Sequence, residues 1–185
     1  MNEKGLARKI TTMAMFAAVS IVLVYLIRFP LFAAAPFLEY DPADIPIFIA
    51  TYLFGPSTGL MLTFAVSVIQ GMTVSAQSGI IGVAMHFFAT GSFVCVAGMI
   101  YKKNKSFSNL ILSAVCGTLM MTTIMILWNL IFTPLFMGTP IKTVAEMLIP
   151  VIIPFNLLKA GINAFISVVV YNLLYKKGIF KISKM

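Results

Sequence analysis

The sequence predicts an all-α, polytopic membrane protein: one integral membrane domain over residues 1–185, built as a bundle of six transmembrane helices. The chain is 61% hydrophobic and only 10% charged, with a mean hydropathy of +1.03, whereas soluble domains are about 25% charged. Its apolar runs reach the roughly 20 residues that a membrane-spanning helix needs. The runs are also continuous, unlike the segments of about 10 alternating residues that form outer-membrane strands.

The first apolar run covers about 10–29 and stops at Pro30, because proline cannot continue helical hydrogen bonding. A basic start and the small residues at 33–35 give this region some likeness to a cleaved signal peptide. The run is longer than the roughly 7–15 apolar residues of a signal sequence. We therefore interpret it as a retained first helix.

Two shorter helices come after a loop that carries the acidic residues Glu39, Asp41 and Asp44. The first covers about 45–54, with Asp44 as a candidate cap, and it ends at a Gly-Pro pair. The second covers about 57–70 and leads into a small, polar loop.

The last three helices are expected over about 80–101, 109–133 and 146–175. The segment KKNKSFS separates the first two of them, Pro134 is expected to end the middle one, and a basic tail comes after the third. No proposed helix repeats another, so the domain is read as a single unit.

Basic residues gather in three segments at the ends of these runs. They are Lys4, Arg8 and Lys9; Lys102, Lys103 and Lys105; and Lys176, Lys177, Lys181 and Lys184. With six helices all three segments fall on one side, and Lys- and Arg-rich ends stay in the cytoplasm. We therefore expect cytoplasmic termini, an outward-facing loop 30–44, and a multi-pass protein of a bacterial cell membrane. This orientation in the lipid bilayer explains the net charge of +8 better than nucleic-acid binding does.

Polar residues inside the apolar runs share one depth. At ~1.5 Å of rise per residue, Lys159 lies about 25 Å from Lys176, and His86 lies about 24 Å from Lys102. The same arithmetic places further polar residues in the outer half of the membrane: Gln70, Asn129, Asn156 and Asn163. Each alone has an ordinary interpretation, such as an interhelical hydrogen bond, a satisfied histidine or a helix end. Together they favour an outward-facing pocket.

The last helix carries the strongest signal. Residues 156, 159, 160, 163 and 167 share one face by their spacing, and they are Asn, Lys, Ala, Asn and Ser. A lysine at the centre of a membrane helix costs about 2.5–3.5 kcal/mol. It can reduce that cost by snorkelling outward. Its polar neighbours instead favour a face turned toward the bundle interior or a water-filled cavity.

Several function classes lack their motifs. The chain has no G-x-x-x-x-G-K-[ST] phosphate loop and no H-E-x-x-H, and it has a single histidine, so neither ATP hydrolysis of that type nor a zinc protease is expected. No metal site, cofactor or catalytic residue is predicted. No acidic residue is expected deep in a span, which counts against a proton-coupled carrier. A substrate-binding membrane subunit, a small secondary carrier and a purely structural protein remain.

Three segments carry a resemblance to a known family. "FLEYDPADIPIFIATYLFGPSTGL" (37–60), "WNLIFTPLF" (128–136) and "IPFNLLKAG" (153–161) resemble the riboflavin-specific S components of energy-coupling-factor (ECF) vitamin transporters. The resemblance covers nearly the whole chain. It implies a six-helix subunit, not itself an enzyme, that binds riboflavin as transported substrate under its first outer loop. It also implies a transmembrane T subunit and two cytoplasmic ATPases as partners.

The resemblance also implies residue roles. Asn129, Asn156 and Lys159 stand at the family's ligand-contacting positions, and His86, Gln70 and Asp44 complete the substrate site that we predict. Ala14 and Ala18, in "AMFAA", match the family's contact with the T subunit, although such small pairs also serve plain helix packing. The chain has Asp-Pro-Ala-Asp at 41–44 where the family more often has D-F-S-D. FMN, a flavin analogue or another vitamin therefore stays open as the substrate.

Overall fold

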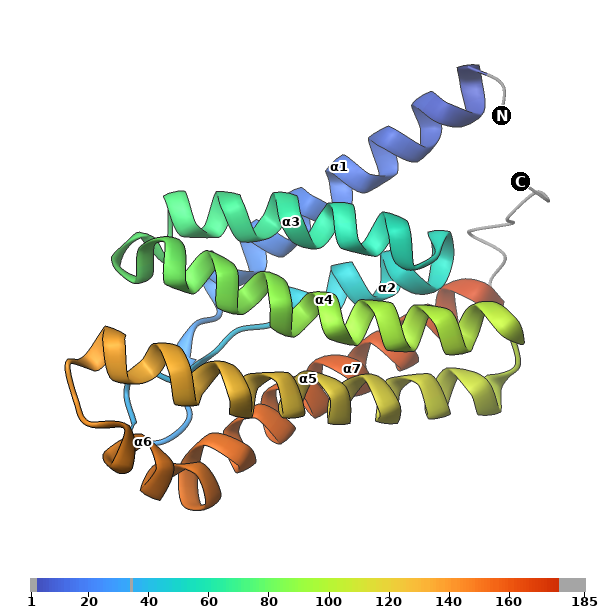
Figure 1. The fold of residues 1–185 in the computed structure, drawn as a ribbon. Coiled ribbons are helices and arrows are strands. Elements are labelled where there is room, and N and C mark those ends of the chain that lie inside the picture. Colours follow the sequence, from blue (N-terminus) through green and yellow to red (C-terminus); the bar gives the residue numbers. More distant parts are fainter. Residues whose placement is uncertain (1–2, 34, 177–185) are drawn as a thin grey trace.

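The structure is a computed structural model that describes residues 3–33 and 35–176. It is a bundle of long helices lying roughly side by side (Figure 1). The elements in chain order are α1 (Glu3–Leu26), β1 (Phe29–Pro30), β2 (Glu39–Tyr40), α2 (Asp44–Phe54), α3 (Pro56–Met72), the 3-10 turn η1 (Ala76–Ser78), α4 (Gly79–Lys103), α5 (Phe107–Met137), α6 (Ile141–Met147), the π turn η2 (Leu148–Ile152) and α7 (Ile153–Lys176). The predicted all-α class is confirmed.

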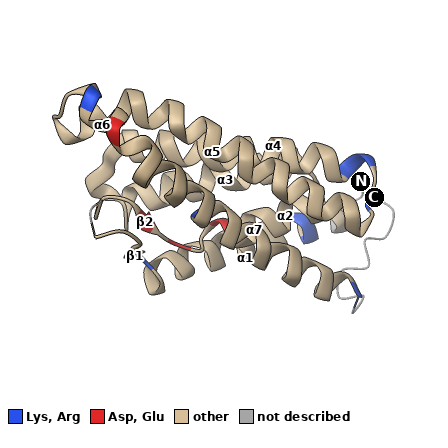
Figure 2. Cartoon of the chain, turned by 90° about the horizontal axis from the view of Figure 1, so that it is seen from below, with Lys and Arg blue, Asp and Glu red and all other residues tan. Residues whose placement is uncertain are grey.

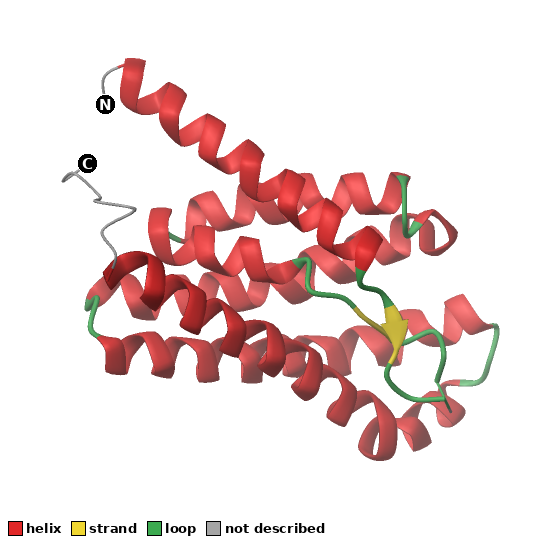
Figure 3. Cartoon of the chain, turned by 180° about the vertical axis from the view of Figure 1, so that it is seen from behind, coloured by secondary structure: helices red, strands yellow, loops and turns green. Residues whose placement is uncertain are grey.

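The first helix is shifted toward the N-terminus relative to the prediction of 10–29. It begins at Glu3 because the basic residues before the apolar run continue the helix, and it ends at Leu26. Phe29 is not helical, since it pairs in antiparallel register with Tyr40 as part of the β1–β2 ribbon. This short ribbon lies in the loop between α1 and α2 (Figure 3).

Pro134 does not end α5, so the predicted stop at that residue is wrong. The helix continues to Met137 with the proline inside it. A proline near the end of a helix removes only one of its hydrogen bonds. The final turn is then closed by Gly138, which adopts φ 63° and donates its N–H to the Pro134 carbonyl, a usual role for a left-handed glycine after a helix.

The last predicted helix, 146–175, is also interrupted. A π turn over Leu148–Ile152 separates α6 from α7. Pro150 lies in that turn and Pro154 comes shortly after it, and two missing backbone donors so close together explain why regular α-helical bonding is lost there. The chain changes direction at this point (Figure 1).

Within the described residues, four helical segments are long and apolar enough to cross a membrane: Gly5–Leu26, Ala76–Lys103, Phe107–Met137 and Ile141–Lys176. The helix α2 has 11 residues, about 16 Å of length, which is too short for a hydrocarbon core of about 30 Å. The number of membrane crossings is therefore not decided by helix length, and six crossings stay a prediction.

The expectation that no acidic residue lies deep in a span is wrong, and the reason is the shortness of α2. Its first residue, Asp44, accepts a hydrogen bond of 2.8 Å from Thr90, which lies near the middle of α4. An acidic side chain therefore does lie deep in the bundle. The loop before α2 reaches inward to that depth, and the helix covers only the remaining distance.

The packed core surrounds α2, whose residues are almost all buried. The ring of Phe48 stacks on Phe93 of α4 with centroids 3.6 Å apart. Gly117 of α5 lies against that second ring, and a Cβ at this position would come within 2.7 Å of it. The glycine thus allows α5 to approach α4 closely.

The predicted basic segments gather at one end of the bundle (Figure 2). The start of α1, the turn between α4 and α5, and the end of α7 share one end, where Lys102 and Lys103 lie (Figure 2). This grouping of the basic segments agrees with the predicted topology. Lys177, Lys181 and Lys184 of the predicted basic tail lie outside the described residues.

Candidate functional site

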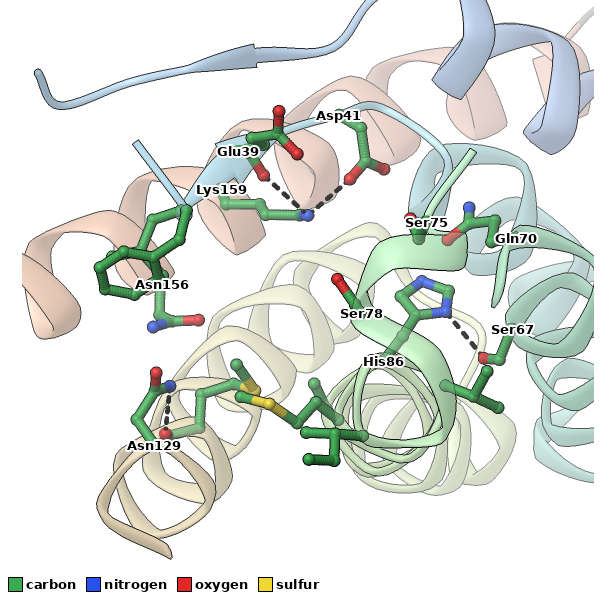
Figure 4. A pocket seen from close by; sticks show the side chains of 18 of the residues that line it. Glu39, Asp41, Ser67, Gln70, Ser75, Ser78, His86, Asn129, Asn156 and Lys159 are labelled. Atoms are coloured by element: carbon green, nitrogen blue, oxygen red, sulfur yellow. Dashed lines mark hydrogen bonds and ion pairs between the residues drawn. The ribbon is translucent and has the colours of Figure 1, made fainter. Parts of the chain in front are cut away.

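A cavity of about 190 Å³ is lined by residues that include Glu39 and Ser75. These belong to the loops between α1 and α2 and between α3 and α4, which lie at the end of the bundle away from the turn between α4 and α5 (Figure 1). Polar side chains from the loop before α2, from α3 to α5 and from α7 face the cavity (Figure 4). Five of the six residues predicted to bind substrate line this cavity: Gln70, His86, Asn129, Asn156 and Lys159. The structure thus brings together residues that span almost 90 positions of the sequence, and their role as ligand contacts stays a prediction.

Lys159 does not snorkel toward solvent. Its Nζ donates to Asp41 Oδ2 at 2.7 Å and to the Glu39 carbonyl at 3.3 Å. The lysine and aspartate side chains keep only 15% and 12% of their surface exposed. The cost of placing a lysine at this depth is therefore offset by an ion pair with the loop that covers the cavity.

The polar stripe of α7 faces the bundle interior, as predicted, with Asn156, Ala160, Asn163 and Ser167 all buried. Asn163 is not among the residues that line the cavity. It donates to the Asp41 carbonyl at 3.0 Å and accepts from the Tyr40 hydroxyl at 3.0 Å. Asn163 therefore fastens the loop before α2 onto α7.

Tyr40 is suited to this bond. Burial raises the pKa of its hydroxyl, and the neighbouring Asp41 carboxylate raises that pKa further. The hydroxyl therefore keeps its proton and can donate it to the Asn163 side-chain oxygen.

Asp44 does not line the cavity and does not cap α2. The residue before the helix, Ala43, makes no side-chain cap bond, and Asp44 is already helical. The carboxylate is completely buried and lies behind His86, whose Nε2 is 3.1 Å from Asp44 Oδ1. Because of this contact, Asp44 is placed to orient His86. The backbone N–H of Ala43 is accepted by Asp41 instead of Asp44, at 3.1 Å.

A Ser–His–Asp line in the cavity wall was not predicted from the sequence. His86 Nδ1 lies 2.7 Å from Ser67 Oγ, on the side of the ring opposite Asp44. The Ser67 hydroxyl donates at 2.7 Å to the Thr63 carbonyl of its own helix, so its single proton is already used there. The line fixes the His86 ring in the cavity wall rather than preparing a serine for attack.

The two asparagines each use one amide proton on a backbone carbonyl four residues earlier in the chain. Asn129 donates to the Met125 carbonyl at 2.7 Å, and Asn156 donates to the Ile152 carbonyl at 2.8 Å. An amide nitrogen carries two protons, so each residue has a second amide proton besides the one used in these bonds. Asn129 also accepts from Thr133 at 2.8 Å.

Gln70 offers a further donor. It lies in the last turn of α3, which extends past it to Met72. Its Nε2 is buried and has no hydrogen-bond partner within the described part of the chain. A buried donor without a partner is costly, and a ligand acceptor at the cavity wall would remove that cost.

Arg28 and Glu39 also line the cavity, and Arg28 was not predicted from the sequence. Arg28 Nε donates to Glu39 Oε2 at 2.6 Å. The guanidinium also reaches the Val74 carbonyl and, at 3.3 Å, the Ser75 hydroxyl. It therefore joins the loop before α2 to the loop between α3 and α4 beside the cavity.

The apolar part of the wall includes three aromatic rings, those of Phe37, Phe136 and Phe155. Trp128, the single tryptophan of the chain, does not line the cavity. It stacks between Phe88 and Phe132, with ring centroids 4.5 Å from each. The rings available to a flat ligand are therefore phenylalanines.

Ala14 and Ala18 lie on an exposed face of α1. The first half of this helix leaves the bundle (Figure 1), and several large apolar side chains on it are exposed, among them Ile10 and Met15. The face is open to a partner, and its role as the contact with a T subunit stays a prediction.

Comparison with known proteins identifies the family. The model of the family "ECF transporter, substrate-specific component" matches residues 8–171. The riboflavin transporter RibU of Streptococcus thermophilus is 31% identical over 172 residues, which cover 89% of this chain and 81% of that protein. The riboflavin transporter RibU of Staphylococcus aureus is 26% identical over 170 residues, covering 89% and 88%.

A solved structure shares the fold. It is the S component of a bacterial ECF transporter, and it aligns with a TM-score of 0.78 and 28% sequence identity over 92% of this chain and 97% of that one. The chain therefore belongs to the family of substrate-specific components of ECF transporters.

Proposed function

We propose that this chain is the riboflavin-binding subunit of an ECF transporter in a bacterial cell membrane. The observation that carries the proposal is the set of polar side chains that converges on one cavity, in a chain whose relatives are riboflavin transporters. The chain captures the vitamin, and a T subunit with two cytoplasmic ATPases supplies the energy for uptake.

The chemistry of the cavity suits this substrate. Riboflavin is uncharged, and one edge of its ring alternates hydrogen-bond donors and acceptors. Asn129, Asn156 and Gln70 present amide groups, which offer both, beside the apolar wall. Buried polar groups discriminate strongly between ligands, because an unmatched group loses its hydrogen bond to water and gains nothing.

The proposed orientation places the cavity outside and both termini in the cytoplasm. The basic segments at the opposite end support it by the positive-inside rule. Six crossings would result if α2 and α3 each count as one pass. The loop that reaches into the bundle would then cover the part of the first pass for which α2 is too short.

The cavity is smaller than the roughly 300–1,000 Å³ of most small-molecule sites. Riboflavin would therefore need the loop between α3 and α4, which Arg28 holds, to move outward during binding, while the loop before α2 stays bonded to α7. Ser75 and Ser78 near that loop line the cavity wall, so its displacement would enlarge the cavity.

One observation favours a second candidate, a small secondary carrier. The pair of Asp44 and His86 lies deep in the bundle, and buried ionisable residues in membrane proteins often carry protons. Uptake by the purified chain alone in liposomes separates the two functions. Riboflavin accumulation driven by a pH gradient would support the carrier, whereas uptake only with the T subunit, the ATPases and ATP would support the ECF subunit.

A further inference from the structure

We propose that a second cavity of this chain, at the basic end of the bundle, binds the anionic headgroup of a membrane phospholipid. The group recognised is a phosphate, which either a lipid or free phosphate can supply, and the cavity favours the lipid. This inference goes beyond vitamin binding, because the second cavity shares no lining residue with the one around Asn129, Asn156 and Lys159.

The second cavity has a volume of about 320 Å³ and lies among the ends of several helices. Residues from the end of α2, the start of α3, the end of α4 and the turn before α5 line it, together with Lys9 of α1. The turn between α4 and α5 and the start of α1 lie at the end of the bundle where the basic segments gather (Figure 2). In the proposed orientation this end is level with the lipid headgroups of the inner membrane surface.

Three lysines line this cavity, and no acidic residue is among its lining residues. They are Lys9, Lys102 and Lys105, which come from three different segments, and none of them forms an ion pair with another described side chain. The positive-inside rule explains why lysines lie at this end, but it does not require three of them to line one cavity. An anion bound there would be compensated by charges that the described part of the protein leaves without an acidic partner.

The start of α3 adds hydrogen-bond donors to the same cavity. Gly55, Pro56 and Ser57 line it, and the described structure shows no side-chain cap bond at this helix start. The first N–H groups of a helix have no partner within the helix, and its dipole favours an anion at that position. Gly55 adopts φ 90°, a conformation that favours glycine, and this lets α3 begin directly after α2.

An apolar part of the cavity wall favours a lipid over free phosphate. Leu53, Phe54 and Pro56 line the cavity beside the lysines, and Phe54 and Pro56 stay partly exposed. An anionic phospholipid carries both a phosphate and acyl chains, so it can contact both kinds of surface, whereas free phosphate can use only the polar one. Basic pockets between membrane helices on the cytoplasmic side commonly bind such headgroups.

The test uses the purified full-length chain, stripped of lipid, in an uncharged detergent. Phosphatidylglycerol is the anionic probe, phosphatidylcholine is the lipid without net charge, and inorganic phosphate is the source without acyl chains. Native mass spectrometry counts the bound lipids, and thermal unfolding reports how far each probe stabilises the folded chain. We expect one saturable phosphatidylglycerol per chain and a raised unfolding temperature, at concentrations where the other two probes have no effect.

The substitutions that test the site are Lys102→Gln and Lys105→Gln combined in one variant. Because a hydrogen bond to a charged group contributes a factor of about ten or more, the double variant should bind phosphatidylglycerol at least about tenfold more weakly. Lys103→Gln is the matched control, since Lys103 is the exposed neighbour of Lys102 on α4 and does not line the cavity. Its affinity for phosphatidylglycerol should be unchanged. Lys9→Gln should weaken binding in the same way and serves if the double variant does not fold.

Each contrary result has a separate meaning. Binding without saturation, or an equal loss in Lys103→Gln, would reveal general attraction to a basic surface and overturn the site. Equal stabilisation by inorganic phosphate would overturn the assignment to a lipid. Unchanged binding of phosphatidylglycerol by a folded double variant or by Lys9→Gln would also overturn the inference, as would lysines needed only for assembly with the energising subunits. Riboflavin affinity should stay the same in all of these variants, so the lipid site and the vitamin site can fail independently.

Discussion

Replacing Asn163 by leucine should loosen the loop that covers the cavity. The side chain is fully buried and makes two bonds of ordinary length to the loop, one with the Tyr40 hydroxyl and one with the Asp41 carbonyl, each 3.0 Å. A third contact, to Asp44 Oδ2 at 3.4 Å, is weaker. Leucine has a similar size, so the change removes the hydrogen bonds with little change in packing.

The magnitude of the effect is set by these bonds. Each buried partner left without its hydrogen bond costs about 1–3 kcal/mol. Leaving both the Tyr40 hydroxyl and the Asp41 carbonyl unsatisfied should therefore destabilise the closed loop by about 2–6 kcal/mol. If binding requires the closed loop, riboflavin affinity should fall by at least about tenfold, since each 1.4 kcal/mol is a factor of ten.

The assay is riboflavin titration together with thermal unfolding of the purified protein in detergent. Tyr40→Phe is the matched comparison, because it removes only the bond to the Asn163 oxygen and should have about half the effect. Combining the two changes should give less than the sum of their effects, as expected for residues in contact. A leucine variant with unchanged affinity and unchanged unfolding temperature would refute the role of Asn163 in holding the loop.

Three further predictions concern other parts of the site and its surroundings. Asn156→Leu removes an amide that faces the cavity and should weaken riboflavin binding by at least about tenfold, measured by fluorescence titration. An unchanged affinity would mean that Asn156 serves only in helix packing. Arg28→Ala unlinks the two loops beside the cavity and should speed riboflavin release several-fold in stopped-flow experiments, and an unchanged rate would count against that link. Ala14→Trp should leave binding intact but prevent uptake with the energising subunits, and normal uptake would exclude the Ala14 face of α1 as the partner contact.

The helices and the polar stripe of α7 could be predicted because their signals are local. Continuous apolar runs mark the helices, and the spacing of Asn156, Lys159 and Asn163 places them on one face whatever surrounds it. Depth arithmetic then brought Asn129 and His86 to the level of that face, and the structure places both with Asn156 and Lys159 around one cavity.

The partners of these residues could not be predicted, because they depend on contacts between distant segments. Asp41 reaches Lys159 across a sequence separation of 118 residues, and only the folded loop shows that the lysine is neutralised. Asp44 looked like a cap because its position beside a helix is local. Its contact with His86 depends on a loop that reaches into the bundle, which no spacing in the sequence reveals.

Pro134 and the π turn of the last helical segment show that a proline alone does not predict where a helix ends. A proline removes one hydrogen bond, but whether the helix then ends depends on the residues after it. Gly138 closes α5 beyond its proline, whereas Pro150 and Pro154 act close together and interrupt the last helical segment.

The central claim is that the cavity of this chain binds riboflavin, and direct titration of the purified protein with the vitamin tests it most directly. We predict saturable quenching of flavin fluorescence at about one riboflavin per chain, with a dissociation constant below the micromolar range, an interaction free energy stronger than about −8 kcal/mol. Absence of quenching at micromolar riboflavin, in protein that remains folded in detergent, would contradict the account.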